Sequence, residues 1–399
     1  MELLNSDKKN NVLQSMMNII DAKRKDIIAE NKKDLEAFKR DDQALYDRLV
    51  VNEAKVDGMI QAIKEVNDQE DPVGQTISNR TLDSGLNIVN KTAPFGTIMI
   101  IYESRPDVTI EAAVLAFKAN NKILLKGGKE AYHSNVILEK CWHEALAEND
   151  LEKSWIRLMH INREETQEFL RNPSEQLDLI VPRGGERLIG FVKEHAKCAV
   201  LISGRGNNFL YVSKNADWEK TIKVIVNAKT DKISGCNALD KVLIDKNISN
   251  YESKVKELAS VLEDKNVEII VDNGIKSILS NKEEISGKDV WHEEFLALKI
   301  LIAEVDGLDQ VIEMINDYSG GHSASIMTTD NAEAEKFMQQ VDSAAVYHNA
   351  STRFTDGGQM GVGAELAIST DKLHHRGPLG LKQLVTNKYY VFGDGHVRV

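Results

Sequence analysis

The sequence predicts an α/β protein with two Rossmann-like domains, each built around a parallel sheet, and a small additional β element. Three observations lead to this fold class. Short apolar runs alternate with helical runs from residue 97 to about 206, and a second alternating series follows toward the C-terminus. A segment with the pattern of a β-hairpin precedes the first series. Alternating strands and helices are typical of a parallel sheet covered by helices, whereas a hairpin belongs to an antiparallel element.

Residues 1 to about 70 are expected to form two or three amphipathic helices. Apolar residues such as Leu13, Met16 and Ile20 recur there at helical spacing. After residue 75 the pattern changes, because NRTLDSGLNIVNKTAPFG alternates around a central Ser-Gly pair, which predicts a long hairpin. An exposed hairpin of this kind often packs on another subunit, so we expect a homo-oligomer.

The two alternating series supply the strands of the two expected sheets. The first contains GTIMIIYES, KILLKGG, LDLIVPRGG and CAVLISGRG, and the second contains KVLIDK, VEIIVD, LALKILIAEV, SASIMTT and AAVYHN. Glycine pairs end two strands of the first series, at Gly127-Gly128 and Gly184-Gly185. Glycine at a strand end lets the backbone approach a phosphate, but it is also a common turn residue, and neither pair forms a G-x-G-x-x-G fingerprint.

Composition excludes several classes of partner. The net charge of −12 argues against binding to nucleic acid or to an anionic membrane, because a uniformly acidic surface repels both. The sequence shows no apolar run long enough for a signal peptide or a membrane span. Three cysteines without a C-x-x-C pair fit a reducing compartment better than disulfides or a zinc site, so we expect a cytoplasmic protein with no metal.

Cys236 is the candidate nucleophile among the three cysteines. Cys141 lies in the helical run EKCWHEAL and Cys198 begins the strand-like run CAVLI, so both are expected to be packing residues. Cys236, in DKISGCNALD, stands where a polar turn opens into an apolar run, a place where backbone N–H groups stabilise a thiolate. On these neighbours alone, a buried hydrophobic role for Cys236 stays open.

Five longer stretches carry a resemblance to a known family. They are IYESRPDVTIEAA, LLKGGKEA, VNAKTDKISGCNALD, VYHNASTRFTDGG and GVGAELAISTDKLHHRGPLGL. Together they resemble the gamma-glutamyl phosphate reductase family of the aldehyde dehydrogenase superfamily, from about residue 80 to the C-terminus. The resemblance implies an aldehyde dehydrogenase-like fold. We expect an NADPH-binding domain at residues 1–79 and 97–216, a catalytic domain at 217–372, and a bridging or oligomerisation element at 80–96 and 373–399.

The resemblance also implies a reaction. Cys236 occupies the family's nucleophile position, and its thiolate attacks the acyl carbon of L-glutamyl 5-phosphate to form a thioester. Reduction of the thioester with NADPH then yields L-glutamate 5-semialdehyde, in the second step of proline biosynthesis. Because glutamate 5-kinase makes the unstable substrate, contact with that kinase is a further expectation.

Residues that bind the oxyanion and the substrate follow from the same motifs. The backbone N–H of Cys236 is one expected oxyanion donor, while the second stays open among Ser104, Arg105 and Asn237. The superfamily carries an asparagine before a proline where this chain has Ser104-Arg105. Arg105 and Arg353 are expected to bind the dianionic phosphate of the substrate, because planar guanidinium groups match phosphate oxygens in pairs.

Residues that bind the cofactor are implied in the same way. Lys126 is expected near the adenosine ribose and Glu294, or alternatively Glu293, near the nicotinamide ribose. Lys129 stands where relatives that prefer NAD carry a glutamate, so its charge favours the 2′-phosphate of NADPH. The glycines of the two pairs complete the predicted cofactor site: Gly127, Gly128, Gly184 and Gly185. His374, His375 and Arg376 match another family segment and are expected to be structural or interface residues.

Two other functions compete with the reductase. The first is a hydrolytic NAD(P)-dependent aldehyde dehydrogenase of the same fold, in which a glutamate activates water against the thioester. The matching place in VLISGRGNN falls at Ile202 or Ser203, neither of which is a strong general base. The second is a binding protein that has lost catalysis, yet Cys236, Arg105 and Arg353 are all present.

Overall fold

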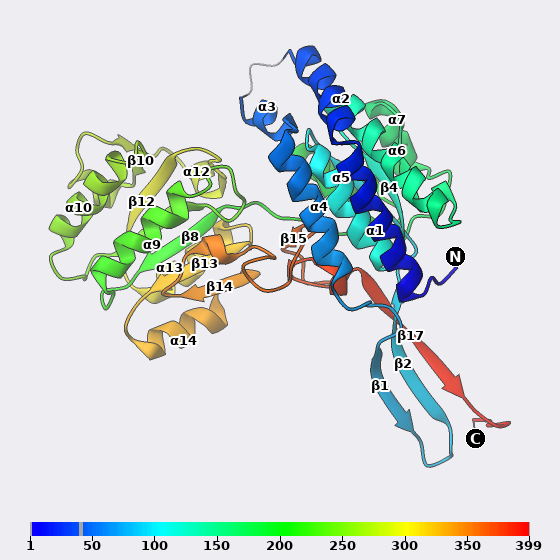
Figure 1. The fold of residues 1–399 in the computed structure, drawn as a ribbon. Helices are drawn as coiled ribbons and strands as arrows, with labels where there is room; N and C mark the ends of the chain where they lie inside the picture. Colours follow the sequence, from blue (N-terminus) through cyan, green and yellow to red (C-terminus); the bar gives the residue numbers. More distant parts are fainter. Residues whose placement is uncertain (1, 40–42, 399) are drawn as a thin grey trace. The chain divides into compact units, whose positions relative to one another are not determined.

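The computed structural model describes residues 2–39 and 43–398, and the chain forms two compact units (Figure 1). The first unit contains the residues up to 202 together with 362–367 and those from 379 onward. The second contains residues 203–361 and 368–378. Each unit has its own parallel sheet, which confirms the prediction of two Rossmann-like α/β domains.

A five-stranded parallel sheet forms the centre of the first unit. Its strands run in the order β5-β4-β3-β6-β7. Their bounds are β3 (Thr97–Tyr102), β4 (Lys122–Lys126), β5 (Ile156–Leu158), β6 (Leu179–Arg183) and β7 (Ala199–Val200). The central strands are apolar on both faces because helices cover both sides of the sheet.

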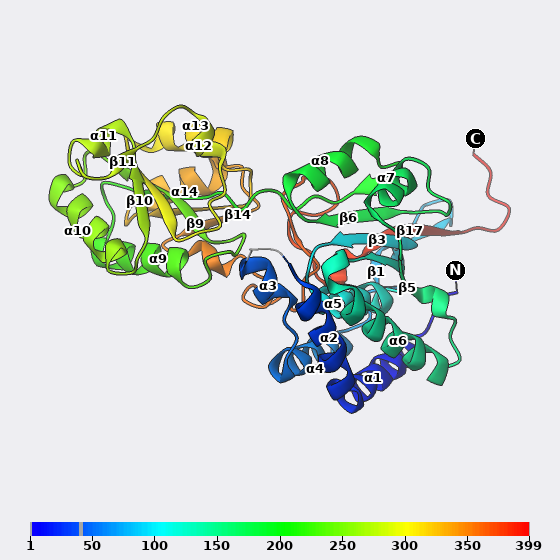
Figure 2. The same ribbon diagram turned by 90° about the horizontal axis from the view of Figure 1, so that it is seen from above.

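Helices pack on both faces of this sheet (Figure 2). On one face lie α5 (Pro106–Lys118) and α6 (Tyr132–Glu148), with the N-terminal helices outside them. On the other face lie α7 (Arg163–Arg171) and α8 (Glu186–His195). The two faces hold separate apolar clusters, because alternate residues of each strand point in opposite directions.

The N-terminal segment forms more helices than expected. Its described residues contain four helices: α1 (Ser6–Ala22), α2 (Arg24–Ala37), α3 (Gln43–Leu49) and α4 (Glu53–Asn67). The side chains of Asn5 and Asn52 cap α1 and α4 by accepting backbone N–H bonds. The prediction of two or three helices was wrong because Lys23 separates α1 from α2 within one apolar pattern.

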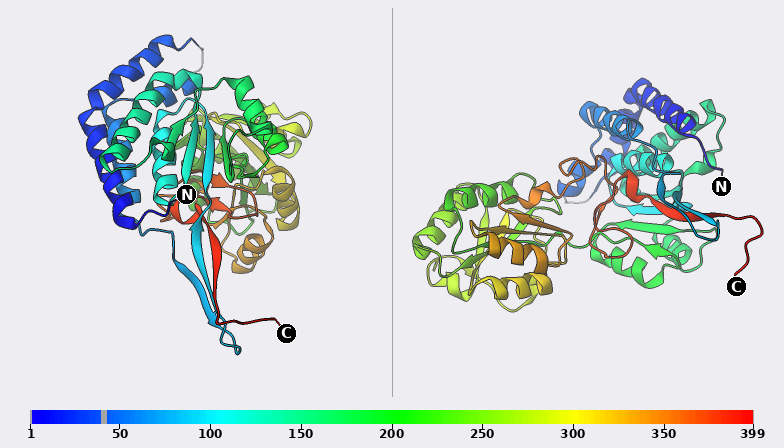
Figure 3. Two further views of the ribbon diagram at one scale, coloured as in Figure 1. Left: turned by 90° about the vertical axis from the view of Figure 1, so that its right-hand side faces the viewer. Right: turned by 90° about the horizontal axis from the view of Figure 1, so that it is seen from below.

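A three-stranded antiparallel sheet extends from the five-stranded sheet of the first unit (Figure 3). Its strands are β1 (Thr76–Thr81), β2 (Asn87–Pro94) and β17 (Val385–Phe392), with β2 in the middle. The β1-β2 pair is the hairpin that the alternating pattern predicted. The C-terminal strand completes the sheet by pairing with β2, whereas residues 373–378 of the expected bridging element belong to the second unit.

The second unit is built on a seven-stranded parallel sheet in the order β11-β10-β12-β9-β8-β13-β14. Its strands are β8 (Asn208–Val212), β9 (Leu239–Asp245), β10 (Glu268–Val271), β11 (Glu283–Glu284), β12 (Lys299–Val305), β13 (Ser323–Met327) and β14 (Ala345–His348). α9 (Trp218–Thr230) and α10 (Tyr251–Glu263) cover one face. α13 (Leu308–Tyr318) and α14 (Asn331–Gln340) cover the other.

Short elements complete the two units. The short helices are η1 (Lys129–Ala131), η2 (Lys153–Trp155), α11 (Asn273–Lys276), α12 (Asp289–His292), η3 (Thr352–Phe354) and η4 (Leu381–Gln383). A two-stranded antiparallel ribbon pairs β15 (Ile368–Ser369) with β16 (Gly377–Pro378).

Two local expectations differ from the structure. β8 was not anticipated, and it pairs with β9 and β13 inside the second sheet. The chain therefore enters the second unit at residue 203, before the boundary expected between 216 and 217. Cys198 was expected in a buried strand, but it precedes the two-residue strand β7 and is half-buried against the smaller cluster of the first unit. Cys141 is fully buried in α6, as predicted.

Candidate active site

Cys236 lies in a tight loop between α9 and β9. The loop is closed by two backbone hydrogen bonds, from Gly235 N–H to the Lys232 carbonyl (3.1 Å) and from Ala238 N–H to the Gly235 carbonyl (2.9 Å). Residues from 237 onward are buried, whereas Cys236 is only half-buried. The thiol therefore stands at the point where an exposed loop becomes the core strand β9.

The segment around η3 holds this loop from one side. The buried side-chain amide of Asn237 donates to the carbonyls of Thr355 (2.9 Å) and Arg353 (3.2 Å), and the Thr352 hydroxyl donates to the Asn237 carbonyl (2.8 Å). Both hydrogens of the Asn237 amide are thus used in anchoring. This occupation argues against the side chain of Asn237 as the second oxyanion donor.

Arg353 stands beside the nucleophile loop. Its Nε lies 3.1 Å from Asp231 Oδ2, and an ideal Cβ placed on Gly235 would lie 2.9 Å from its Nη1. A cavity of about 300 Å³ opens here, lined by Asn227, Asp231, Arg353, Phe354, Asp356 and Gln359. The cavity offers one guanidinium group and two carboxylates, a combination that suits a ligand with both an anionic and a cationic group.

Glu294 is linked to the same loop through Gly206. Burial and the nearby Asp240 carboxylate raise the pKa of Glu294, while a hydrogen bond from the Gly206 amide opposes that rise. Gly206 in turn packs against the main chain of Cys236, since an ideal Cβ there would lie 2.0 Å from the Cys236 carbonyl oxygen. Glu293 is exposed, and its carbonyl accepts a bond from the Lys241 ammonium.

A buried cluster of charges holds the segment that carries Glu294. Asp240 Oδ1 lies 3.0 Å from Lys229 Nζ, and Asp240 Oδ2 accepts the Phe295 N–H at 3.1 Å. Lys241 Nζ lies 4.0 Å from the centre of the Phe295 ring, a cation–π contact. Burial lowers the pKa of Lys241 to about 8, against the opposing pull of the Asp240 carboxylate. β9 therefore begins directly after the loop of Cys236, and its residues Asp240 and Lys241 hold the segment that contains Glu294.

In the first unit, the other predicted residues gather at one edge of the sheet. β3 is flanked by β4 and β6, so the order of the strands reverses around β3, and such a switch point is where open α/β sheets bind ligands. The loop after β3 carries Ser104, which is buried, and Arg105, whose Nη2 lies 3.1 Å from Asp107 Oδ2. Lys126 ends β4, and its ammonium donates to the Gly127 carbonyl at 2.8 Å.

The two glycine pairs stand at the ends of β4 and β6 and differ in their surroundings. An ideal Cβ on Gly127 would lie 2.2 Å from Asn135 Nδ2, and one on Gly128 would lie 3.2 Å from the Glu103 carbonyl carbon, so both positions are packed closely. Gly184 lies against the Leu188 and Glu103 side chains, whereas Gly185, the N-cap residue of α8, has open space around the position of a Cβ. Gly185 is therefore the glycine that leaves room for a ligand at a helix N-terminus.

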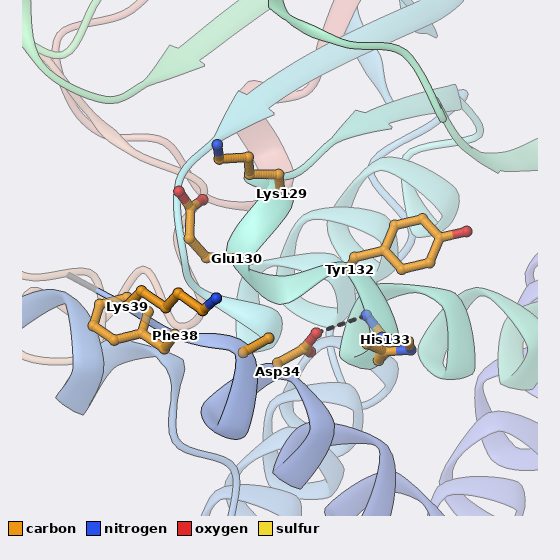
Figure 4. Close-up of a pocket in the computed structure, with 8 residues that line it drawn as sticks. Asp34, Phe38, Lys39, Lys129, Glu130, Tyr132 and His133 are labelled. Atoms are coloured by element: carbon orange, nitrogen blue, oxygen red, sulfur yellow. Dashed lines mark hydrogen bonds between the residues drawn. The ribbon is translucent and has the colours of Figure 1, made fainter.

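Lys129 lines a second cavity, of about 370 Å³, in the first unit (Figure 4). Phe38 and Lys39, from the segment after α2, lie opposite Lys129 and Glu130 of η1. The remaining lining residues are Asp34, Ala37, Tyr132 and His133. Asp34 accepts bonds from the N–H groups of His133 (2.9 Å) and Ser134 (2.8 Å), which fixes the start of α6 beside the cavity.

Comparisons with known proteins identify the family to which the chain is similar. The aldehyde dehydrogenase family model matches residues 9–276 and 283–365. The gamma-glutamyl phosphate reductase of Caldicellulosiruptor bescii is 43% identical over 99% of this chain and 95% of its own. That of Dictyoglomus thermophilum is 39% identical over 100% of this chain and 96% of its own. The crystal structure of the Thermotoga maritima gamma-glutamyl phosphate reductase superposes with a TM-score of 0.94 at 39% identity, covering 99% of this chain and 95% of that one.

The chain belongs to the aldehyde dehydrogenase family, and within it to the gamma-glutamyl phosphate reductases. This membership confirms the aldehyde dehydrogenase-like fold and the assignment as an oxidoreductase. It also implies a nicotinamide cofactor. The switch point in the first unit fits such a group, because Gly185 leaves open space at the N-terminus of α8.

Other segments that family resemblance singled out have structural roles here. Arg376 donates to the carbonyls of Thr370 (3.1 Å) and Asp342 (2.9 Å) and forms an ion pair with the Asp342 carboxylate (2.7 Å). The Lys372 and Arg376 charges lower the pKa of Asp342. His374 has a positive φ of 69°, at the turn of the same segment. Among the described residues, no helix is long and apolar enough to span a membrane, and no cluster of metal ligands occurs.

Sequence reasoning missed the residues that hold the nucleophile loop from the side of β8. Gly206 and Asn208 both contact the main chain around Cys236. The available signal was the segment GRGNN, which stands directly before the apolar run FLYV.

Proposed function

We propose that this protein reduces L-glutamyl 5-phosphate to L-glutamate 5-semialdehyde and phosphate with NADPH, through a thioester on Cys236. The single observation that carries the proposal is the Cys236 loop, half-exposed and anchored beside Arg353, in a chain about 40% identical to proteins named for this reduction. The product lies on the route to proline.

The residues of the second unit support each chemical step. The Cys236 thiolate attacks the acyl carbon, the new C–S bond forms, and phosphate leaves with the electron pair of the C–O bond. When bound, NADPH supplies a hydride to the thioester carbon. The Cys236 sulfur then leaves as a thiolate, which releases the aldehyde. The backbone N–H of Cys236 is the proposed donor to the oxyanion at both tetrahedral stages, because main-chain donors held in a fixed loop need no rearrangement.

The cavity beside Arg353 supports a role in substrate binding. L-Glutamyl 5-phosphate carries two anionic groups and an ammonium group, and the cavity combines Arg353 with Asp231 and Asp356. Arg353 is our proposed ligand for an anionic group of the substrate, while the two carboxylates suit its ammonium group. Arg105 and Ser104 keep their proposed roles from family resemblance, as phosphate ligand and second oxyanion donor.

NADPH, rather than NADH, is proposed as the cofactor. Lys129 and Lys39 both line one cavity of the first unit, and a cation there attracts a 2′-phosphate. Lys126 and Glu294 are the proposed contacts to the two riboses. For Glu294 in preference to Glu293, the support is its carboxylate beside the Gly206 amide. Gly127, Gly128, Gly184 and Gly185 shape the cofactor crevice.

Cytoplasmic location and self-association complete the proposal. β17 exposes Tyr389 (62%), Val391 (55%) and Phe392 (59%), apolar side chains that a second copy of the chain would cover. Contact with glutamate 5-kinase is proposed on chemical grounds, since acyl phosphates hydrolyse readily in water. Sedimentation of the protein alone and mixed with the kinase tests both associations.

A phosphate titration of the reverse reaction tests the function. With semialdehyde and NADP in phosphate-free buffer, a reductase of this kind forms NADPH only when phosphate, or arsenate in its place, is added to take the acyl group. Neither Ile202 nor Ser203 supplies a base to activate water, so the rate should rise from near zero with phosphate. Sustained turnover without phosphate would instead identify a hydrolytic aldehyde dehydrogenase.

The variant Cys236→Ala is the matched control for that assay. It should lose all turnover while keeping its folding and its affinity for NADPH, because the change removes only a half-buried thiol. Retention of a tenth of wild-type activity would contradict the covalent mechanism. Inactivity of the wild-type enzyme on semialdehyde, despite intact NADPH binding, would refute the proposed substrate.

A further inference from the structure

The side chain of Asn208 contacts the nucleophile loop, although the mechanism described above gives Asn208 no role. It is fully buried at the start of β8. Its Nδ2 lies 2.8 Å from the Cys236 carbonyl oxygen, 2.7 Å from that of Ala238 and 2.9 Å from that of Gly206. Three carbonyls thus converge on one amide group that has two hydrogens.

The irregular register of the two strands explains this convergence. Asn208 is opposite Leu239, but the next residue, Phe209, is opposite Lys241, so β9 carries one extra residue against β8. Such a bulge interrupts the regular ladder and leaves main-chain carbonyls to be satisfied by other donors. The Asn208 side chain fills that role at the point where the loop of Cys236 enters the sheet.

The contact determines the orientation of one peptide group. The Cys236 carbonyl and the Asn237 N–H belong to the same planar peptide and point in opposite directions. Because the carbonyl points toward Asn208, the N–H is directed away from it, and a flip of this peptide would break a hydrogen bond in the core. Gly206 packs on the same peptide, with its ideal Cβ only 2.5 Å from the Cys236 carbonyl carbon.

We propose that Asn208 is a positioning residue for Cys236, which fixes the peptide after the nucleophile and with it the main chain that carries the thiol. Asn208 acts through the main chain and touches neither substrate nor cofactor. The inference rests on Cys236 as the nucleophile of the proposed function. It does not depend on the identity of the acyl substrate.

Asn207 offers a matched control. It is also fully buried, and its Nδ2 donates to two carbonyls, those of Trp291 (2.7 Å) and Tyr318 (2.8 Å). Neither carbonyl belongs to the loop of Cys236. Replacing Asn207 or Asn208 by alanine therefore removes a buried asparagine with carbonyl partners in both cases, but only the second change frees the nucleophile loop.

The experiment measures the reactivity of Cys236 directly. Wild type, Asn208→Ala and Asn207→Ala are treated with iodoacetamide between pH 6 and 10, and alkylation of each cysteine is followed by mass spectrometry, which separates Cys236 from Cys141 and Cys198. Asn208→Ala should shift the alkylation profile of Cys236 to higher pH and slow the reaction at least tenfold at neutral pH. Asn207→Ala should leave the profile in place.

Steady-state kinetics give the second measurement. In the phosphate-dependent oxidation of semialdehyde, Asn208→Ala should lower kcat by about ten- to a hundredfold with the KM for NADP unchanged within twofold. Asn208→Ser, which keeps one donor, should recover part of both properties and covers the case in which the alanine variant does not fold. Equal losses of kcat in the Asn207 and Asn208 variants, with unshifted alkylation of Cys236, would reduce Asn208 to a structural residue. If the wild type proves to act on a substrate other than the semialdehyde, and Asn208→Ala lowers kcat for that substrate and shifts the alkylation of Cys236, the proposed function fails. The inference about Asn208 would then still stand.

Discussion

Replacing Gly206 with alanine should inactivate the enzyme by displacing its nucleophile. The added Cβ would lie 2.0 Å from the Cys236 carbonyl oxygen and 2.5 Å from both its carbonyl carbon and its Cα, whereas ordinary contacts begin at 3.4 Å. These are main-chain atoms on both sides, so no flexible side chain can move out of the way. The loop of Cys236 must therefore shift by roughly 1 Å or more, in an interior packed too densely to absorb the change.

The size of the effect follows from that displacement. Overpacking in a core costs about 1–3 kcal/mol of unfolding free energy. A misplacement of roughly 1 Å at a reacting group costs on the order of a hundredfold in rate. Gly206→Ala should therefore lower kcat by about a hundredfold, as measured in the phosphate-dependent oxidation of semialdehyde, and shift urea unfolding of the second unit by a few kcal/mol at most.

Gly58 provides the control for glycine replacement. It lies in the interior of α4, is exposed, and has no atom within 4 Å of an ideal Cβ. Gly58→Ala should stabilise the first unit by about 0.5–1 kcal/mol and leave kcat unchanged, because alanine restricts the unfolded chain. A Gly206→Ala enzyme with wild-type kcat and normal stability would show that the close approach to Cys236 does not matter for catalysis, and the steric reasoning would fail.

Three further predictions concern the cofactor, an unused histidine and a second cysteine. Lys129→Glu should raise the KM for NADPH far more than that for NADH, and equal effects on both cofactors would remove Lys129 from the site. His322 is fully buried, and burial lowers its pKa from 6.5 to about 4. Above pH 6.5 its imidazole is neutral in both states, but between about pH 6.5 and 4 only the unfolded chain gains the proton, so stability falls there by roughly 3 kcal/mol in total. The free energy of unfolding, measured with urea across this range, should depend less on pH in His322→Gln than in the wild type. Parallel pH profiles of the two proteins would contradict a lowered pKa for His322. Cys198→Ala should cost about 1 kcal/mol of stability with no loss of activity, since the side chain packs on a small cluster outside the Cys236 loop; a loss of activity would give Cys198 a role that we do not foresee.

The fold class and the candidate nucleophile could both be predicted from the sequence. Strands such as β3 and β12 appear as continuous apolar runs because helices bury both of their faces, and this local property can be recognised without knowing which strands are neighbours. The hairpin of β1 and β2 is equally local, since alternation around a turn specifies it. Cys236 was distinguished from Cys141 and Cys198 by its own neighbours and by a resemblance that spans most of the chain.

Only the tertiary structure decided how the loop of Cys236 is held. The partners that support it are far away in the chain: Asn208 reaches carbonyls 28 and 30 residues later, and Asn237 bonds to a carbonyl 118 residues away. No periodicity links such positions, because the contacts arise from the way β8 and β9 align and from the bulge between them. β8 itself escaped prediction for the same reason, since its place between β9 and β13 depends on pairing across the sheet and not on its own short run of apolar residues.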